Sequence, residues 1–189
     1  RPPLPPALPS PGSPPMPPAR PPSPPTPPPS SPVPPILFTE VFALATDLWR
    51  YEGSAVLDDG TMVFVPFNLD NVGLFDPSTD SFSTVNVSHA VTGNNKYTGA
   101  AAVGGVAVFA PRDSNTVGVF DASTRSFEAV DISATVSGSF QYCGAAASGG
   151  RVVFAPRNAD SVGVFDVANR TFTAVDISAT ISSNNKYCG

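Results

Sequence analysis

Few residues in this chain belong to the types that usually do chemistry. His89 is its single histidine, and Cys143 and Cys188 are its two cysteines. The sequence has no HExxH motif, nucleophile elbow or phosphate-binding loop. One imidazole is also too few for a typical copper site. These residues therefore predict no catalytic set, no metal site and no cofactor, and a role other than catalysis is favoured.

Carboxylates recur at regular intervals. Asp76, Asp121 and Asp166 each follow an apolar run and precede a short polar stretch. A pair of carboxylates of the glycosidase kind stays open as one interpretation. Asp in this position also caps a tight turn by accepting hydrogen bonds from backbone N–H groups nearby. We expect these residues to form turns.

These intervals come from a repeat that organises most of the chain. Residues 51–96, 97–141 and 142–186 align almost without gaps, and 187–189 begin a fourth copy. Each copy holds four short runs rich in Val, Phe and Ala, separated by turn residues such as Gly149 and Gly150. Four strands in about 45 residues make one blade of a β-propeller. We predict an all-β fold, an incomplete β-propeller of about three four-stranded blades.

The aromatic residues of the repeat are expected to fill the layers between blades. Phe109 falls in the second strand of its copy, Phe120 in the third and Phe127 in the fourth, and all three recur in the other copies. Burying such rings is what allows neighbouring repeats to stack. Gly118 and its equivalents lie inside a strand, which predicts close packing by a neighbouring blade.

Polar residues cluster in two sets of loops. In a four-stranded meander, the loop after the second strand and the loop before the first strand emerge on the same face. Loops on one face of a rigid scaffold often carry function. We expect a protein or glycan ligand there, and a solvated set of loops is the alternative. The candidate ligand-binding residues are Arg112, Arg157, Lys96, Lys186, Asp113 and Asp160.

The two cysteines occupy the same position in successive copies. Equivalent positions of neighbouring blades should lie about one blade spacing apart. That spacing exceeds the roughly 7 Å between Cα atoms that a disulfide tolerates. We therefore expect Cys143 and Cys188 to be two buried thiols that are not bonded to each other.

The order of motifs in each copy resembles kelch-type β-propeller repeats. It runs Gly-Gly, apolar strand, polar loop, Val-x-Val-Phe-Asp, turn, aromatic and Val-Asp-Ile, and covers roughly residues 38–189. Two departures stand out: Phe172 and its equivalents replace a Trp, and Gly-Gly precedes the second strand. Kelch-type propellers include adaptors, cytoskeletal binders and a copper oxidase, so the resemblance implies a fold and no single activity.

A different composition precedes the repeats. Pro fills more than half of residues 1–35, which predicts a disordered or polyproline II stalk. Its Ser-Pro-Pro units resemble the hydroxyproline-rich, extensin-like stalks of plant and algal wall glycoproteins. Residues 36–50 are expected to supply the last strand of a partial blade and a linker, with a helix as the alternative. The sequons at Asn86 and Asn169 are candidate glycosylation sites and favour an extracellular setting.

Charge narrows the class of partner. Of the 10 Lys and Arg, only Arg1 and Arg20 lie in the stalk, which has no acid, so the remainder carries a net charge of −7. A nucleic-acid partner is therefore not expected. No apolar run is long enough for a membrane span. Because the chain begins with Arg and ends at the start of a repeat, we expect a fragment or processed form that self-associates through open blade edges.

These observations favour a non-catalytic binding or structural module on a stalk, extracellular or associated with a cell wall. An intracellular, cytoplasmic adaptor of the kelch type is the first alternative. A fragment of a propeller enzyme that acts on carbohydrate is the second.

Overall fold

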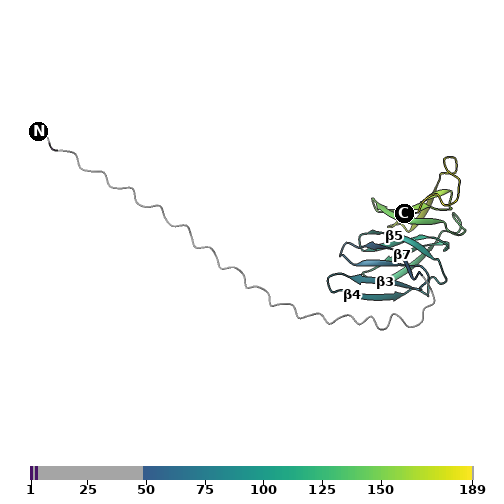
Figure 1. Cartoon of the computed structure of the whole chain (residues 1–189), viewed down its shortest axis with the longest axis horizontal. Coiled ribbons are helices and arrows are strands. Elements are labelled where there is room, and N and C mark those ends of the chain that lie inside the picture. Colours follow the sequence, from purple (N-terminus) through teal and green to yellow (C-terminus); the bar gives the residue numbers. More distant parts are fainter. Residues whose placement is uncertain (2, 4–48, 189) are drawn as a thin grey trace. The chain divides into compact units, whose positions relative to one another are not determined.

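The computed structural model describes residues 1, 3 and 49–188, and within them it contains strands and turns but no helix. The strands form three four-stranded antiparallel sheets, one from each repeat (Figure 1). Nearly all of the expected stalk and of the expected strand at residues 36–50 lies outside the described residues.

The first sheet consists of β1 (Tyr51–Val56), β2 (Met62–Pro66), β3 (Asn71–Asp76) and β4 (Ser81–Asn86). The second consists of β5 (Tyr97–Val103), β6 (Val106–Pro111), β7 (Thr116–Asp121) and β8 (Ser126–Asp131). The third consists of β9 (Tyr142–Ser148), β10 (Arg151–Pro156), β11 (Ser161–Asp166) and β12 (Thr171–Asp176).

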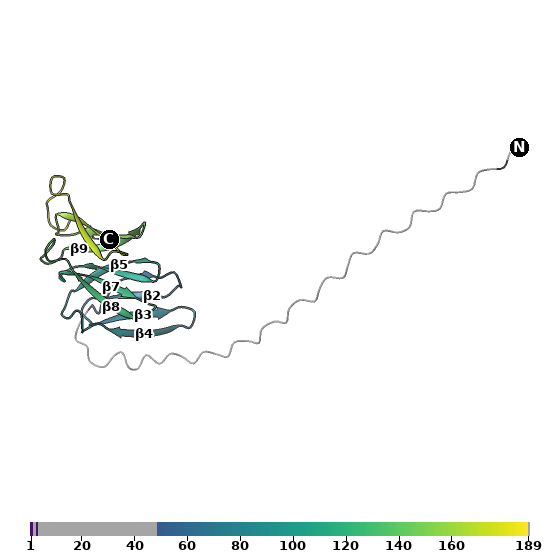
Figure 2. The ribbon, with the colours of Figure 1, turned by 180° about the vertical axis from the view of Figure 1, so that it is seen from behind.

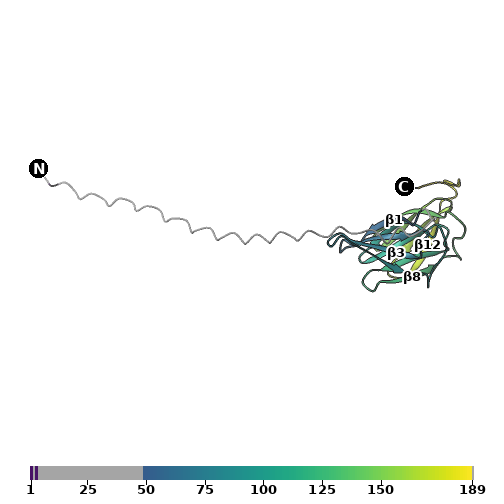
Figure 3. The ribbon, with the colours of Figure 1, turned by 60° about the horizontal axis from the view of Figure 1, so that its bottom comes forward.

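Each sheet is a meander in which every strand pairs with the next one along the chain. Turn residues set the connections: Gly104 and Gly105 close the hairpin in which Val103 pairs with Val106. Gly104 has φ 61°, a backbone conformation that glycine adopts without a steric penalty. This architecture is the all-β, incomplete propeller that the repeat predicted. Figure 2 shows the sheets stacked as successive blades, and in Figure 3 strands of all three overlap in projection.

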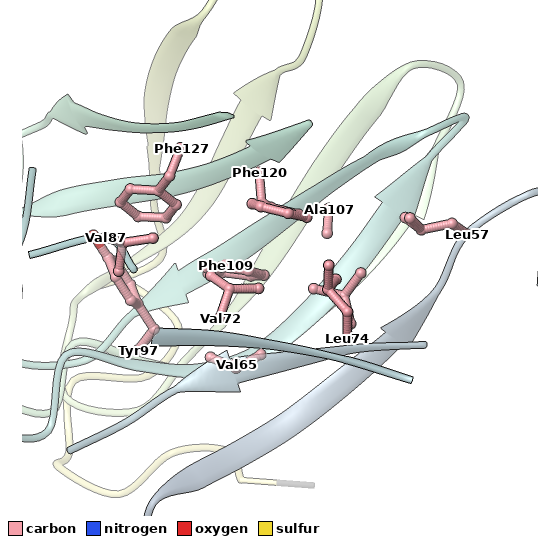
Figure 4. Packing of buried hydrophobic residues seen from close by; sticks show 11 residues of the cluster. Leu57, Val65, Val72, Leu74, Val87, Tyr97, Ala107, Phe109, Phe120 and Phe127 are labelled. Atoms are coloured by element: carbon pink, nitrogen blue, oxygen red, sulfur yellow. The ribbon is translucent and has the colours of Figure 1, made fainter. Parts of the chain in front are cut away.

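Neighbouring blades share an apolar core. On the side of the first blade it holds aliphatic residues such as Val65, Val72 and Leu74, all buried. The second blade contributes a more aromatic set to this core, of which Phe109 and Phe120 are fully buried (Figure 4). The junction between the second and third blades repeats this arrangement with Val117, Phe154 and Phe165 among its members. The prediction that the repeated aromatics fill the layers between blades is confirmed for the second and third blades.

The glycine in each third strand is crowded by side chains of its own blade. A Cβ atom added to Gly118 would lie 2.9 Å from Phe109 Cδ2 and 3.1 Å from Tyr97 Cζ, both in the same sheet. Gly163 is crowded in the same way by Phe154 and Tyr142. The expectation of a neighbouring blade at this glycine is wrong. The missing side chain instead makes room for the ring cluster within each sheet, such as Tyr97, Phe109 and Phe127.

The first strands converge. The pairing of each first strand with its second strand shifts register near its start, between Tyr51 and Ser54 in β1 and between Tyr97 and Ala100 in β5. Such a bulge redirects the chain. Gly53 and Gly99 lie at these shifts, and a Cβ atom on Gly53 would lie 2.6 Å from the Gly99 Cα atom. The backbones of adjacent blades therefore touch here.

This convergence overturns the prediction that the cysteines are separate thiols. Cys143 and Cys188 form a disulfide with their Cα atoms 5.0 Å apart. A uniform spacing between blades would have kept the two cysteines apart. Blades in fact close toward their first strands, where Gly99 and Gly144 allow contact of the two backbones. Equivalent positions beside these glycines therefore come within disulfide distance.

Two blade faces have no neighbouring blade within residues 49–188. On the third blade, aliphatic residues equivalent to those of the inter-blade cores line a hollow of about 580 Å³, among them Val153, Val162 and Ile177. On the first blade, Phe64 packs against Tyr51 and Phe82, and Phe82 is 48% exposed. Each junction between blades packs an aliphatic face against an aromatic one. The third blade thus presents a free aliphatic face and the first blade a free aromatic face within the described residues.

Candidate functional site

The two sets of polar loops lie together, as their topology predicted. The N–H of Arg112 donates to the Lys96 carbonyl oxygen at 3.0 Å, and the N–H of Gln141 donates to the Arg112 carbonyl oxygen at 2.9 Å. Side chains add a second link, because the N–H of Phe140 donates to Asp113 Oδ1 at 2.8 Å. We call this end of the blades the loop face. It comprises residues 67–70, 112–115 and 157–160 together with 49–50, 92–96, 137–141 and 182–186.

The two predicted lysines are buried under this face. Lys96 Nζ lies 2.9 Å from Asp70 Oδ1, and the lysine side chain is 2% exposed. Lys186 Nζ lies 2.8 Å from Asp160 Oδ1, with its side chain 0% exposed. Both ammonium groups also donate to a backbone carbonyl oxygen. Their contacts are therefore structural, and a ligand would reach their aspartate partners before it reached the lysines.

In the middle repeat, a neutral pair takes the place of this ion pair. At the same two positions this repeat has Asn115 and Gln141, and Gln141 Nε2 donates to Asn115 Oδ1 at 3.0 Å and to the Gly138 carbonyl oxygen at 2.9 Å. A neutral amide pair thus replaces the ion pair with the same connectivity. Gln141 is also 2% exposed. The sequence itself indicates that these two positions are paired, because Asp and Lys in the first and third repeats change together to Asn and Gln in the second.

Arginine and aromatic side chains alternate along the loop face. The guanidinium carbon of Arg112 lies 4.6 Å from the ring centroid of Phe67 and 4.3 Å from that of Phe140. The guanidinium carbon of Arg157 lies 4.7 Å from the same ring centroid of Phe140. Trp49 packs against Phe67 with ring centroids 6.4 Å apart. We call these five residues the arginine–aromatic row.

The two arginines of the row differ in accessibility. The Arg112 side chain is 13% exposed, its Nη1 lies 3.4 Å from Glu52 Oε2, and its buried Nε has no hydrogen-bond partner within residues 49–188. Arg157 is half-buried, and its Nε donates to Asn185 Oδ1 at 3.2 Å. Arg112 therefore stabilises the face from within, while Arg157 also presents its guanidinium to solvent.

The row includes strained backbone. Trp49, Asn95, Phe140 and Asn185 hold the same place, two residues before the first tyrosine of a repeat, and have φ values of 72°, 55°, 57° and 56°. Asn tolerates this left-handed conformation, whereas a bulky ring there is uncommon. Trp49 and Phe140 were not among the site residues predicted from the sequence. The signal was present, since only these two copies carry an aromatic residue where the others carry Asn.

Two hollows open near these residues. One holds about 230 Å³ and is lined by Trp49, Phe67, Asn68, Asn95 and Arg112. The other, about 270 Å³, lies where the first strands converge, beside Glu52, Thr98 and the disulfide. Thr98 Oγ1 donates to the Tyr142 carbonyl oxygen there, which occupies its hydroxyl hydrogen. The first hollow combines rings with amide groups, a composition suited to binding a polar ligand.

The recurrent aspartates form turns. Asp121 Oδ1 accepts from the Ser123 N–H at 2.9 Å and from Ser123 Oγ at 2.7 Å, and Asp76 makes the same bonds with Ser78. These bonds favour the carboxylate, so the hydroxyl of Ser123 lowers the pKa of Asp121 and that of Ser78 lowers the pKa of Asp76. The prediction that they are turn formers is confirmed.

The two candidate glycosylation sites are accessible. Asn169 is exposed in the turn between β11 and β12, and its N–H donates to Asp166 Oδ1 at 2.9 Å. Asn86 is the exposed last residue of β4, and its Oδ1 accepts from the Ser88 N–H at 2.9 Å. Glycosylation at either residue stays a prediction.

Residues 49–188 contain no group of three or more His, Cys, Asp and Glu side chains placed to hold a metal ion. In the same part of the chain, no helix is long and apolar enough to cross a membrane.

Comparison with known proteins gives the fold. No family model matches the chain, and no curated protein matches its sequence. Among solved structures, it is similar to virginiamycin B lyase from Staphylococcus aureus, with a TM-score of 0.56 and 15% identity over 70% of this chain and 42% of that one. It is also similar to Kuenenia stuttgartiensis hydrazine synthase, with a TM-score of 0.54 and 15% identity over 71% and 38%. AztD from Citrobacter koseri has a TM-score of 0.50 and 11% identity over 77% and 39%. The chain thus spans about two fifths of the length of these structures, and at this identity the likeness shows a β-propeller fold alone.

Proposed function

We propose that this chain is a non-catalytic binding module of the β-propeller type, whose loop face binds a protein or a glycan. The arginine–aromatic row is the observation that carries the proposal. It offers the partly accessible guanidinium of Arg157 and an indole, Trp49, that is 66% exposed. Arg and Trp are the residue types most often responsible for binding energy at protein interfaces.

The proposed setting is extracellular or in a cell wall, with residues 1–35 as a stalk. The disulfide between Cys143 and Cys188 supports this setting, because disulfides persist in oxidising compartments and are rare in the cytosol. The two accessible sequons agree with it. Hydroxyproline with arabinose or galactose in a hydrolysate of the native protein would support it. A glycan-free cytosolic pool with both cysteines reduced would favour the kelch-type adaptor.

The loop face can be tested against a panel of immobilised oligosaccharides and peptides. The informative variant is Arg157→Ala, and the matched control is Arg125→Ala, which removes an exposed arginine from the turn at the other end of the strands. We expect Arg157→Ala to weaken binding of the best probe by about tenfold, as loss of a central contact does. Equal binding by both variants and the wild type would place the ligand elsewhere.

A second proposed interaction is self-association through the two open blade faces. The aliphatic face around Val162 and the aromatic face around Phe82 are the two halves of the interface between blades. Val162→Asp should block the first face and Phe82→Asp the second. Each variant alone should be monomeric by light scattering, while a mixture of the two should form dimers, because each retains one intact half. A mixture that stays monomeric would rule out this mode of association.

A further inference from the structure

The molecule shows what an aromatic ring at one place in its repeat binds. Phe140 stands two residues before the first tyrosine of the third repeat, and its ring lies between two guanidinium groups. Arg112 is 4.3 Å from the ring centroid and Arg157 is 4.7 Å from it. A planar cation over an aromatic ring is attracted by the negative electrostatic potential of the ring face.

Trp49 holds the same place before the first repeat. It shares the left-handed backbone of Phe140, with φ 72° against 57°. Its ring packs on Phe67 at 6.4 Å with the planes tilted by 39°. Unlike Phe140, however, it has no arginine over its ring among the contacts between described residues, and it is 66% exposed. Within residues 49–188, Trp49 therefore contacts one ring, that of Phe67, and keeps most of its surface exposed.

The backbone conformation of Trp49 is unfavourable for a bulky residue. A bulky residue in the left-handed region is strained and persists where other contacts compensate for the strain. The equivalent residues Asn95 and Asn185 avoid most of this strain, because Asn adopts the conformation readily. At Phe140 two arginines compensate. At Trp49 the tilted contact with Phe67 is the ring contact within the described residues, which leaves room for a ligand to supply the rest.

We propose that Trp49 binds an arginine side chain of a partner protein, which completes the arginine–aromatic row. This inference rests on the proposed function, because it names the partner class for the loop face. The adjoining hollow of about 230 Å³ is large enough for a guanidinium group and is lined by the amide residues Asn68 and Asn95. Indole is the aromatic ring that attracts cations most strongly.

Charge favours this occupant over a neutral sugar. The chain outside its Pro-rich segment carries a net charge of −7, which attracts basic segments over distances beyond direct contact. The nearest cation of the row, Arg112, is paired with Glu52 at 3.4 Å, which reduces its repulsion of an incoming guanidinium. Two arginines already share Phe140, so the face accommodates cations on successive rings.

Trp49 is the sole tryptophan of the chain, so its fluorescence reports on this site directly. The full chain would be titrated with three probes: a Gly-Ser peptide containing several arginines, the same peptide with lysine at each of those positions, and an arabinogalactan oligosaccharide. A fluorescent label on each peptide gives affinities independently by anisotropy. We expect both peptides to bind the acidic surface, and the arginine peptide to bind about three- to fivefold more tightly and to change the indole emission.

Substitutions separate the ring from general charge. Trp49→Ala should bind the two peptides equally and leave the affinity of the lysine peptide unchanged. Trp49→Phe should retain part of the arginine preference, because it keeps a ring. Val56→Ala, which truncates another exposed apolar side chain of the first blade, should retain all of it. Circular dichroism would check that each variant is folded.

Three results would overturn the inference: equal affinity of the two peptides for the wild type, an arginine preference that survives Trp49→Ala, or an emission change with the oligosaccharide and none with the arginine peptide. The last result would leave the loop face as a binding site, for a glycan. Failure of the loop face itself would instead appear in the comparison of Arg157→Ala with Arg125→Ala, which does not involve Trp49.

Discussion

At the scale of single residues, chemistry that looked available for ligands proves to be structural. Lys96 and Lys186 were predicted to face a ligand, yet their ammonium groups are buried against Asp70 and Asp160. A sequence records that Lys follows two Asn residues in both copies. It does not record the path of a long side chain, which here turns inward along the blade. Arg112 turns inward in the same way, to contact Phe67 and Glu52.

The replacement of the ion pair by an amide pair in the middle repeat gives a prediction. Asp70→Asn should lower the free energy of unfolding by about 1–3 kcal/mol, because it leaves the buried ammonium of Lys96 without its carboxylate. Adding Lys96→Gln recreates the pair found at Asn115 and Gln141, and should restore stability to within about 1 kcal/mol of the wild type. Urea unfolding of the two single variants and the double variant measures the coupling. Additive losses would show that the two side chains act independently.

The turn aspartates predict a loss of stability in acid. Hydrogen bonds from Ser123 lower the pKa of Asp121 below its ordinary value of 3.8, and Asp76, Asp131, Asp166 and Asp176 are lowered likewise. A lowered pKa in the folded state contributes stability that is present above the ordinary value and is lost as the pH falls through the lowered one. Asp121→Asn keeps an acceptor that does not titrate, so its stability should fall less steeply over this range. Urea midpoints measured as the pH is lowered would test this, and identical slopes would contradict it.

At the scale of the strand, the repeat predicted the elements well and their convergence poorly. Alternating apolar runs and turn residues such as Gly104 are local signals, and they placed strands and hairpins correctly. The bulge that follows Tyr97 is a long-range feature, because it depends on where β5 meets β6 and the adjacent blades. The disulfide lies at the equivalent shift of β9, where Gly144 follows Cys143, and a uniform spacing between blades therefore excluded a bond that the structure contains.

The disulfide closes a loop with a sequence separation of 45, which spans the whole third blade. Cys188→Ser should lower the free energy of unfolding of the oxidised protein by about 2–4 kcal/mol, since the cross-link restricts the unfolded chain. The same variant should be indistinguishable from the wild type once a reductant is present. Denaturant unfolding with and without reductant makes this comparison. A wild type that gains nothing from oxidation would show that the bond is not formed in solution.

At the scale of the whole molecule, three similar blades build two equivalent cores. The aromatic set predicted from sequence meets the aliphatic set of the preceding blade at both junctions. What the sequence could not predict is which equivalent residues are left at an outer face. Phe120 is fully buried, whereas its equivalent Phe75 on the first blade is only half-buried. Equivalent positions in different repeats are therefore expected to contribute unequally to the stability of the fold.

This inequality can be measured. Phe120→Ala should lower the free energy of unfolding by about 3–5 kcal/mol, because it empties space in a packed core. Phe75→Ala should cost clearly less, and Arg125→Ala, an exposed change, should stay within about 0.5 kcal/mol. Arg112 does not serve as an exposed control, since its side chain is 13% exposed. Equal losses for Phe120 and Phe75 would mean that the outer aromatic face is covered in solution.

The alternation of ion pair, amide pair and ion pair along the blades also bears on how such a chain avoids misassembly. Similar tandem repeats risk exchanging blades with one another or with a second chain while they fold. Here, docking the strand that follows Gln141 beside the first blade would set an amide against Asp70, and the strand that follows Lys96 would meet Asn115 beside the second blade. A buried ammonium without its carboxylate would penalise that arrangement. The amide pair thus distinguishes the junction that follows the second repeat from the one that follows the first, and it disfavours exchange of the strands between these two places.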